Sequence, residues 1–430
     1  MRVAFYECDI TPPLGGYVWG HYHEVRPQNV KDCLYARAMV TEGDDGTVAA
    51  FVTVDCCALP PEIHDIVTAR IQQYTGIRPE NVCISSNHTH WGAPVCDSPE
   101  LDCYADETYR DVFFRRTADA VTLAYRRLDT AEARFGCDVA ENIAFCRNYV
   151  LKDGSVVTWA GGIDPADIAG RTVDADPTLS VLVYERAGKP IGALINFACH
   201  QCCCPDNDYT GDFSSIFSKD LKKIYGEDFV SVFLLGTAGD INHIPHNQFK
   251  TSPDHYRMMG HTIAEGVVRA INKATPLSGE VAVVKEPITL EHRTIGQEEF
   301  RKQVEFLNKY SEMRLRNLMY YKTTNQKTEG EYLLQALRIG DVCIYAMPGE
   351  VFQRFGQKLK AQSSYQKAVV VQNCNTYCGY IPTPDMFGEN CKGVYEASLC
   401  YHSCLLPEAG DMMVEKLLTL GEKIKSGDRS

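Results

Sequence analysis

Side chains able to bind metal ions or to transfer protons recur at the ends of apolar, strand-like runs in this sequence. His88 and His90 follow one such run, His200 ends a second, Glu350 follows a third at a Pro-Gly turn, and Tyr380 lies after a fourth. Taken alone, a polar residue at a strand end is more often a hydrogen-bonded structural group than a ligand. Open α/β sheets, however, place their sites at strand ends, so the recurrence favours one shared site.

Alternation of apolar strand-like segments with amphipathic helix-like segments predicts the α/β class for the whole chain. The expected helices span 61–74, 107–128, 213–225, 253–272, 296–321 and 407–425, and the expected strands span 48–54, 82–85, 179–183, 192–197, 230–235, 341–346 and 368–372. We expect one domain over residues 1–430. The only long polar stretch, 309–332, contains an expected exposed loop at 322–330 and marks a loose subdivision.

Composition excludes several classes of protein. The chain of 430 residues has a formal net charge of -13. It therefore lacks the excess of positive charge that neutralises the phosphates of nucleic acids, and we expect no nucleic-acid partner. An acidic residue, Glu7, interrupts the N-terminal apolar run before a signal-peptide core forms, and no stretch reaches the ~20 apolar residues of a membrane span. The sequence therefore predicts a soluble, cytoplasmic protein without a transmembrane segment.

Nineteen cysteines would be compatible with a disulfide framework, but the chain is long and the count is odd. Several cysteines also lie inside strand-like runs, which favours reduced, packed thiols. Cys199 and Cys202 form one C-x-x-C pair, and no second pair follows at the spacing of a zinc ribbon.

Taken in order along the chain, the motifs resemble the catalytic domain of the neutral, non-lysosomal ceramidases. The similarity is carried by Asp9-Ile10-Thr11-Pro12-Pro13, Val54-Asp55, Thr75-Gly76-Ile77, His88-Thr89-His90, Phe145-Cys146-Arg147-Asn148, the run into His200, Gly236 to Asn242, Pro348-Gly349-Glu350-Val351, Gly379 to Thr383 and Tyr395-Glu396. The resemblance implies a fold with large mixed central β-sheets flanked by helices.

The resemblance also implies a catalytic zinc site. By analogy with the family, one zinc ion per chain is held by a ligand set made of His88, His200, Glu350 and Tyr380. Histidine and carboxylate ligands suit zinc, and a position left for water makes such a site catalytic. Zinc can lower the pKa of its bound water toward ~7, which supplies a nucleophile near neutral pH.

Three further residues receive roles from the same resemblance. His90 would be the acid/base that protonates the leaving nitrogen, while Arg147 and Tyr395 would bind the developing oxyanion. For Arg147 a surface salt bridge is the alternative. The resemblance thus predicts a hydrolase that cleaves an N-acyl amide bond.

Departures from the family narrow this prediction. Ceramidases carry a serine near the position of Asn242, so a serine nucleophile has no support and attack by water is expected. The immunoglobulin-like C-terminal domain and an export signal are also absent from this sequence, which favours a small soluble or amphiphilic N-acyl substrate over a membrane lipid.

Alternatives remain open at this point. The same zinc site would serve an ester, lactone or N-acetyl-sugar hydrolase, and a catalytically silent metal-binding protein is a further possibility. Cys202, Cys203 and Cys204 should line the pocket, with a reactive thiol as the alternative. Asp212 could bind a substrate hydroxyl or cap the helix that follows it. The sequence predicts neither the oligomeric state nor a second, structural metal.

Overall fold

Three mixed β-sheets form the body of the protein. The computed structural model describes residues 1–21, 23–99, 102–245, 251–324 and 327–427, with only the backbone at 309 and 310. The first sheet has the order β4-β3-β2-β1-β5, with β1 (Arg2–Asp9), β2 (Tyr35–Glu42), β3 (Val48–Val54), β4 (Val82–Ser86) and β5 (Asp129–Thr130).

The second and third sheets repeat the mixed pattern. The second has the order β13-β12-β11-β6-β15, with β6 (Glu132–Val139), β11 (Thr178–Arg186), β12 (Lys189–Phe197), β13 (Val230–Leu235) and β15 (Thr275–Pro276). The third has the order β16-β17-β18-β20, with β16 (Val281–Glu291), β17 (Glu329–Ile339), β18 (Val342–Ala346) and β20 (Lys367–Val371).

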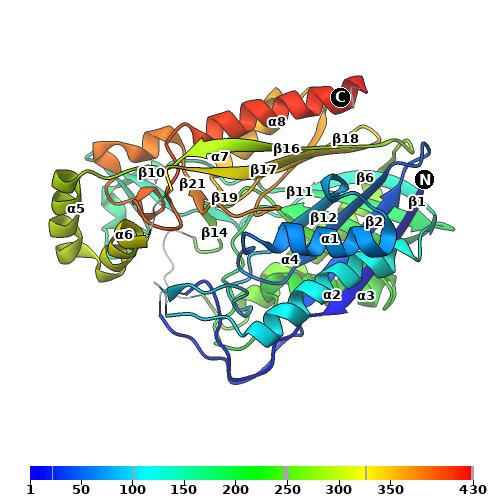
Figure 1. The fold of residues 1–430 in the computed structure, drawn as a ribbon, viewed down its shortest axis with the longest axis horizontal. Helices are drawn as coiled ribbons and strands as arrows, with labels where there is room; N and C mark the ends of the chain where they lie inside the picture. The colour runs from blue at the N-terminus through cyan, green and yellow to red at the C-terminus, as the bar shows by residue number, and fades with distance from the viewer. Residues whose placement is uncertain (22, 100–101, 246–250, 325–326, 428–430) are drawn as a thin grey trace.

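Helices cover the outer faces of these sheets, as Figure 1 shows. Helix α2 (Glu107–Tyr125) packs on β1 to β3 with α1 (Ile63–Thr75) beside it, and α4 (His255–Lys273) packs on β6 and β11 with α3 (Asp212–Tyr225) beside it. Helices α7 (Gln353–Gln362) and α8 (Ala409–Ser426) cover the third sheet. Helices α5 (Gln297–Tyr310) and α6 (Glu312–Thr324) project at one end of the molecule.

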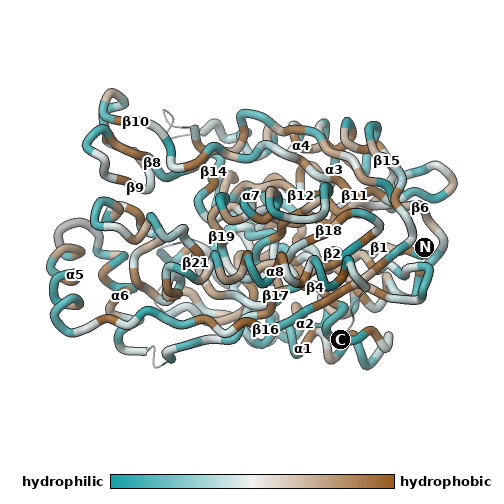
Figure 2. The backbone as a smooth tube through the Cα atoms, turned by 90° about the horizontal axis from the view of Figure 1, so that it is seen from above, coloured by the Kyte–Doolittle hydropathy of each residue, from teal (hydrophilic) through white to brown (hydrophobic). Residues whose placement is uncertain are grey.

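Both faces of the central strands are buried, which explains their continuous apolar runs. In β18, Val342, Ile344 and Ala346 join a core cluster that all three sheets share, whereas Cys343 and Tyr345 face α7 and α8. Figure 2 shows hydrophobic residues concentrated along the central strands and hydrophilic residues in the outer turns. The α/β class with mixed sheets flanked by helices is therefore confirmed.

Each large sheet contains one parallel pair of strands: β3 with β4, β12 with β13, and β18 with β20. Parallel neighbours end at the same edge of a sheet. The segments after β4, β12 and β18 carry His88, His200 and Glu350. This topology brings three distant parts of the sequence to one place.

The structure differs from the expected elements in the region 296–332. The single helix predicted at 296–321 is divided at Ser311 into α5 and α6. The loop predicted at 322–330 is shorter than expected, because α6 continues to Thr324 and β17 begins at Glu329. Residues 325 and 326 of that loop lie outside the described residues.

Candidate metal and catalytic site

The segments that carry His88 and His200 lie side by side. An isolated parallel bridge pairs Thr89 with Gln201, and the amide of His90 donates to the carbonyl of Gln201 at 2.9 Å. His88 therefore lies opposite His200, and the centroids of their rings are 4.7 Å apart. His88 has a left-handed φ of 64°, a conformation that is uncommon for non-glycine residues.

Glu350 reaches the same place through a second short pairing. It lies in β19 (Glu350–Val351), which pairs in parallel with β21 (Tyr380–Ile381), so that Glu350 and Tyr380 are direct partners in register. The preceding Gly349 has a φ of 68°, and a Cβ at this position would lie 2.4 Å from the carbonyl oxygen of Gly379. Only glycine fits this turn without a backbone shift.

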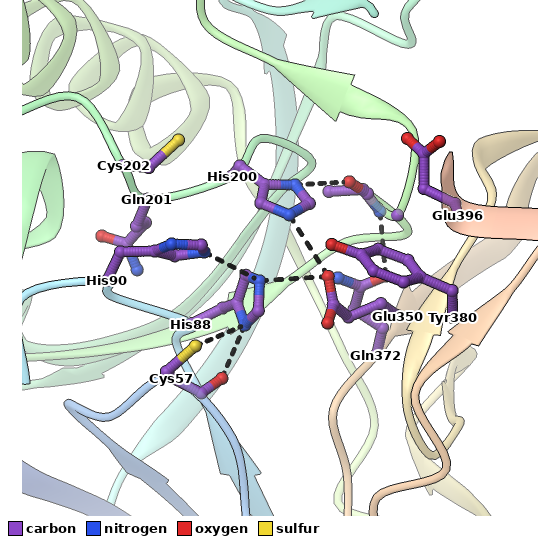
Figure 3. Close-up of polar contacts among 12 residues, drawn as sticks. Cys57, His88, His90, His200, Gln201, Cys202, Glu350, Gln372, Tyr380 and Glu396 are labelled. Carbon is purple, nitrogen blue, oxygen red and sulfur yellow. Dashed lines mark hydrogen bonds and ion pairs between the residues drawn. The ribbon is translucent and has the colours of Figure 1, made fainter. Parts of the chain in front are cut away.

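The two imidazoles and the carboxylate converge on one point (Figure 3). Oε2 of Glu350 lies 3.2 Å from Nε2 of His88 and 3.2 Å from Nε2 of His200. The opposite nitrogens face backbone carbonyls: Nδ1 of His88 lies 2.5 Å from the Cys57 oxygen, and Nδ1 of His200 lies 2.7 Å from the Ala238 oxygen. These contacts place the imidazole protons on Nδ1 and leave both Nε2 atoms directed at the cluster.

The cluster has the properties of a metal site. His88, His200 and Glu350 are buried, with exposed fractions of 2%, 1% and 3%. Nε2 of His200 and Oε2 of Glu350 have no hydrogen-bond partner among the described residues, an arrangement that is costly for buried polar atoms. A cation bound between them would satisfy both, and this donor set suits zinc and other first-row metals.

The pKa values of the cluster agree with this assignment. Burial opposes ionisation of Glu350, but the neighbouring His88 and His200 outweigh it and hold its pKa well below the usual range. Burial, with Arg147 nearby, lowers the pKa of His200 to about 4. Burial likewise favours neutral His88, yet the Glu350 carboxylate raises the pKa of His88. The ionised carboxylate of Glu350 is thus stabilised by a positive charge between it and the two histidines, and a metal ion would supply that charge.

His90 lies at the same centre. Its Nε2 is 3.3 Å from Nε2 of His88, and burial together with the neighbouring imidazoles lowers its pKa well below the usual value. Cys57, His88 and His90 form a second group whose ligand atoms lie within 4.8 Å of one another. The geometry therefore brings His90 to the site and makes Cys57 a further neighbour that the sequence did not single out.

Arg147, Tyr380 and Tyr395 form one wall of the site. The hydroxyl groups of Tyr380 and Tyr395 lie 3.0 Å apart, and Nη2 of Arg147 donates to the Tyr380 hydroxyl at 3.3 Å. Arg147 is only 4% exposed and pairs through Nε with Glu396 at 2.8 Å. The salt bridge of Arg147 is thus buried rather than at the surface, and it holds the guanidinium beside both tyrosines.

Two residues of this site received no role in the sequence analysis. Glu396, which is fully buried, anchors Arg147, and the only signal for it is its place after Tyr395. Tyr377 donates through its hydroxyl to Oε1 of Glu350 at 2.7 Å, and its position three residues before Tyr380 was the available signal. Tyr377 leaves Oε2 as the carboxylate oxygen directed at the histidines.

The cluster lies in a cavity of about 490 Å³. All three tryptophans of the chain, Trp19, Trp91 and Trp159, line this cavity, together with Tyr401 and the residues above. Its wall is therefore aromatic and polar rather than purely aliphatic. A cavity with a few convergent polar groups is typical of a small-molecule site.

The cysteines that follow His200 lie in or next to the wall of this cavity. Cys202 and Cys204 line the cavity, whereas Cys203 is buried beside it. Burial raises the pKa of the Cys202 thiol to about 12 and that of Cys204 to about 12, which disfavours thiolates. Asn242 also lines the cavity and donates to the Cys202 sulfur at 3.4 Å.

Asp212 makes hydrogen bonds both at the start of α3 and to segments outside that helix. It is the first residue of α3, and its carboxylate accepts from the backbone amide of Phe213 at 2.6 Å. It also accepts from the amide of Cys203 at 2.6 Å and from the indole of Trp91 at 3.2 Å. Asp212 therefore joins the helix start to the loop that follows His200.

Together these features define a mixed α/β protein with a buried histidine and carboxylate cluster suited to a metal ion. No protein-family model and no curated protein sequence matches the chain. Among solved structures, the chain is similar to the crystal structure of neutral ceramidase from Pseudomonas aeruginosa, with a TM-score of 0.76 and 16% identity over 99% of this chain and 74% of that chain. It is also similar to a ceramidase complexed with C2, with a TM-score of 0.76 and 17% identity over 99% of this chain and 75% of that chain.

At this level of identity the comparison concerns the fold, and the predicted resemblance to neutral ceramidases is confirmed for the fold. Within the described residues, no helix is both long enough and apolar enough to cross a membrane.

Proposed function

We propose that this protein is a zinc-dependent hydrolase that cleaves an N-acyl amide bond. The observation that carries the proposal is the convergence of His88, His200 and Glu350 at a buried point of the aromatic cavity, with buried ligand atoms that lack other partners. The likeness to structures named as ceramidases supports amide cleavage as the reaction.

The proposed ligands are His88, His200 and Glu350, with Tyr380 as the fourth. Tyr380 is the register partner of Glu350, and Figure 3 shows it beside that carboxylate. Zinc, when bound, would polarise the substrate carbonyl and lower the pKa of a water molecule. Neutral histidines and an ionised carboxylate are the protonation states that such a metal requires.

The remaining residues act on the substrate. His90 presents Nε2 next to the ligands, where it would hold the proton that the leaving nitrogen requires. Tyr395 and Arg147 would donate to the developing oxyanion, with Arg147 kept in place by Glu396. Asn242 lacks a nucleophilic oxygen, and the raised pKa of Cys202 disfavours a thiolate, so water is the proposed nucleophile.

The proposed substrate is an N-acyl derivative of a small soluble or amphiphilic amine. The exposed Trp159 and Tyr401 contribute aromatic surface to the cavity, and His90 and Arg147 contribute polar groups. A cavity of this size encloses a small acyl group with part of its amine.

Metal analysis and a substrate panel test the proposal together. Purified protein should contain about one zinc per chain, and His88→Ala and His200→Ala should lose it, while the exposed His261→Ala should retain it. N-acyl amides, esters, lactones and N-acetyl sugars are then compared with and without a chelator. Amide hydrolysis that chelation abolishes and zinc restores would support the proposal.

Other results would contradict parts of the proposal. Activity confined to esters, lactones or sugars would keep the metal chemistry and replace the substrate class. A zinc-loaded protein inactive on the whole panel would favour a silent metal-binding protein, and an active but metal-free enzyme would end the zinc hypothesis.

A further inference from the structure

A second cavity, of about 500 Å³, lies away from the metal site between helices α5 and α6 and the segment 386–399. Arg293 and Arg314 line it together with Phe306, Met386 and Phe387. The cavity thus combines two guanidinium groups with an apolar wall.

Neither arginine has an acidic partner within ion-pair distance among the described residues. Arg293 donates to the Ala397 oxygen at 2.9 Å and to the Ser403 oxygen at 2.6 Å, and Arg314 donates to the Lys392 oxygen at 3.1 Å. Their Nε atoms are buried without a hydrogen-bond partner in the described part of the chain. Burial lowers the pKa of both arginines, and the charge of Glu396, which opposes burial at Arg314, does not offset it.

Other charged groups at the cavity are already engaged or exposed. Lys392 pairs with Glu389, and Lys302 pairs with Glu298 at 3.1 Å. Glu299 lines the cavity but is exposed to solvent. Two partly buried guanidinium groups at one cavity are costly unless an anion compensates them, and arginine binds carboxylate and phosphate with paired hydrogen bonds.

We propose that this cavity binds an amphiphile with a small anionic headgroup, either a carboxylate or a phosphate monoester. The headgroup would lie against Arg293 and Arg314, and the apolar part would lie among Phe306, Met386 and Phe387. The same arginines hold the segment 397–403, which directly follows Tyr395 and Glu396 of the metal site. An occupant would therefore contact the back of the segment that carries one wall of that site.

Calorimetric titration of the full chain with dodecanoate and with dodecyl phosphate tests the proposal and distinguishes the two headgroups. Each titration is run on zinc-loaded and on chelator-treated protein, because a carboxylate could also bind a metal. We expect one site that persists after chelation, with weaker binding of uncharged dodecanol and of inorganic phosphate. Binding that disappears with the metal would overturn the proposal.

Variants locate the site. Arg314→Gln should weaken binding by about 10-fold or more, as expected for the loss of a charge-assisted hydrogen bond. Arg301→Gln, an exposed arginine of the same helical pair outside the cavity, should bind as the wild type does. If Arg314→Gln fails to fold, Phe306→Glu supplies the test by placing a negative charge in the cavity wall, and unchanged affinity in either folded variant would refute the site.

Discussion

At the scale of single residues, the contacts of the imidazole nitrogens indicate which histidines bind the metal and which one only lies next to it. Nδ1 of His88 faces the Cys57 carbonyl and Nδ1 of His200 faces the Ala238 carbonyl, and such contacts orient the metal-binding nitrogen in most histidine ligands. Nε2 of His90 instead faces Nε2 of His88. This difference favours His88 and His200 as ligands and His90 as the group that transfers a proton.

Replacement of His90 tests that division. His90→Ala should retain about one zinc per chain but lower kcat by ~10²–10⁴-fold, the usual contribution of general acid–base catalysis. Zinc content and kcat are measured on the same preparation, with Cys57→Ala as a control that should keep both. Loss of zinc from the His90 variant would show that His90 is a ligand.

Gln372 holds two of the ligand segments together. Its Oε1 accepts from the amide of Ala238 at 2.9 Å and from the amide of Val351 at 2.9 Å. Ala238 supplies the carbonyl that orients His200, and Val351 follows Glu350. Figure 3 shows Gln372 directly behind this cluster. One buried side chain therefore fixes the spacing of two ligands.

Gln372→Leu should leave two buried amides unpaired, with a loss of stability of ~1–3 kcal/mol for each. Because the ligands lose their relative position, zinc affinity should fall by ~10–100-fold. Chelator competition measures the affinity. Gln335→Leu is the matched control, since this buried glutamine bonds to the Glu80 carbonyl and to Asn375 instead. Equal effects of both variants on zinc affinity would argue against a positioning role for Gln372.

At the scale of elements, the site depends on strand ends and on two-residue strands. The pairing of β19 with β21 places Glu350 beside Tyr380, and it requires the tight turn at Gly349. These elements are too short to leave a hydrophobic period in the sequence. Their position is set by contacts with neighbouring segments.

Gly349→Ala should disrupt this turn. The added Cβ would meet the Gly379 oxygen at 2.4 Å in a left-handed conformation, so we expect a loss of ~3 kcal/mol or more and at least tenfold weaker zinc binding. Gly154→Ala is the control, because Gly154 also has a left-handed φ but no heavy atom within 4 Å of the added Cβ. That variant should lose only ~1 kcal/mol and keep its zinc. Denaturant unfolding and metal analysis compare the two.

At the scale of the whole molecule, buried acidic groups make stability depend on pH. Burial raises the pKa of Asp212 from 3.8 to about 6, although four hydrogen bonds oppose the shift. Between these values the folded protein binds more protons than the unfolded chain. The contribution of Asp212 to stability therefore falls as pH rises from about 3.8 to about 6 and is constant above that range.

Asp212→Asn removes this titration and resembles the protonated acid in shape. The free energy of unfolding of the wild type relative to this variant should decrease by on the order of 3 kcal/mol between pH 4 and pH 7. Urea unfolding of both proteins at several pH values measures this difference in the free energy of unfolding. The contributions of the other titrating groups are the same in both proteins and cancel. A difference independent of pH would mean that Asp212 is ionised throughout.

The three sheets share one core cluster, and the sequence leads us to expect a single domain over residues 1–430. That expectation stays a prediction, as do the cytoplasmic location and the assigned roles of the site residues.

The sequence alone determined the class of fold, most of the buried strands and the residues able to bind a metal, because apolar runs and strand-end polar clusters are local patterns. The strands β1, β2, β6, β16 and β17 were missed. Exposed or half-buried positions interrupt the apolar pattern in β1, β6, β16 and β17, and the buried polar residues Arg37 and Thr41 interrupt it in β2. Only the tertiary structure decided which side chains meet: Cys57 beside His88, Tyr377 on Glu350, and Glu396 on Arg147. The paired residues are 31, 27 and 249 positions apart in the chain, and no local period in the sequence records such separations.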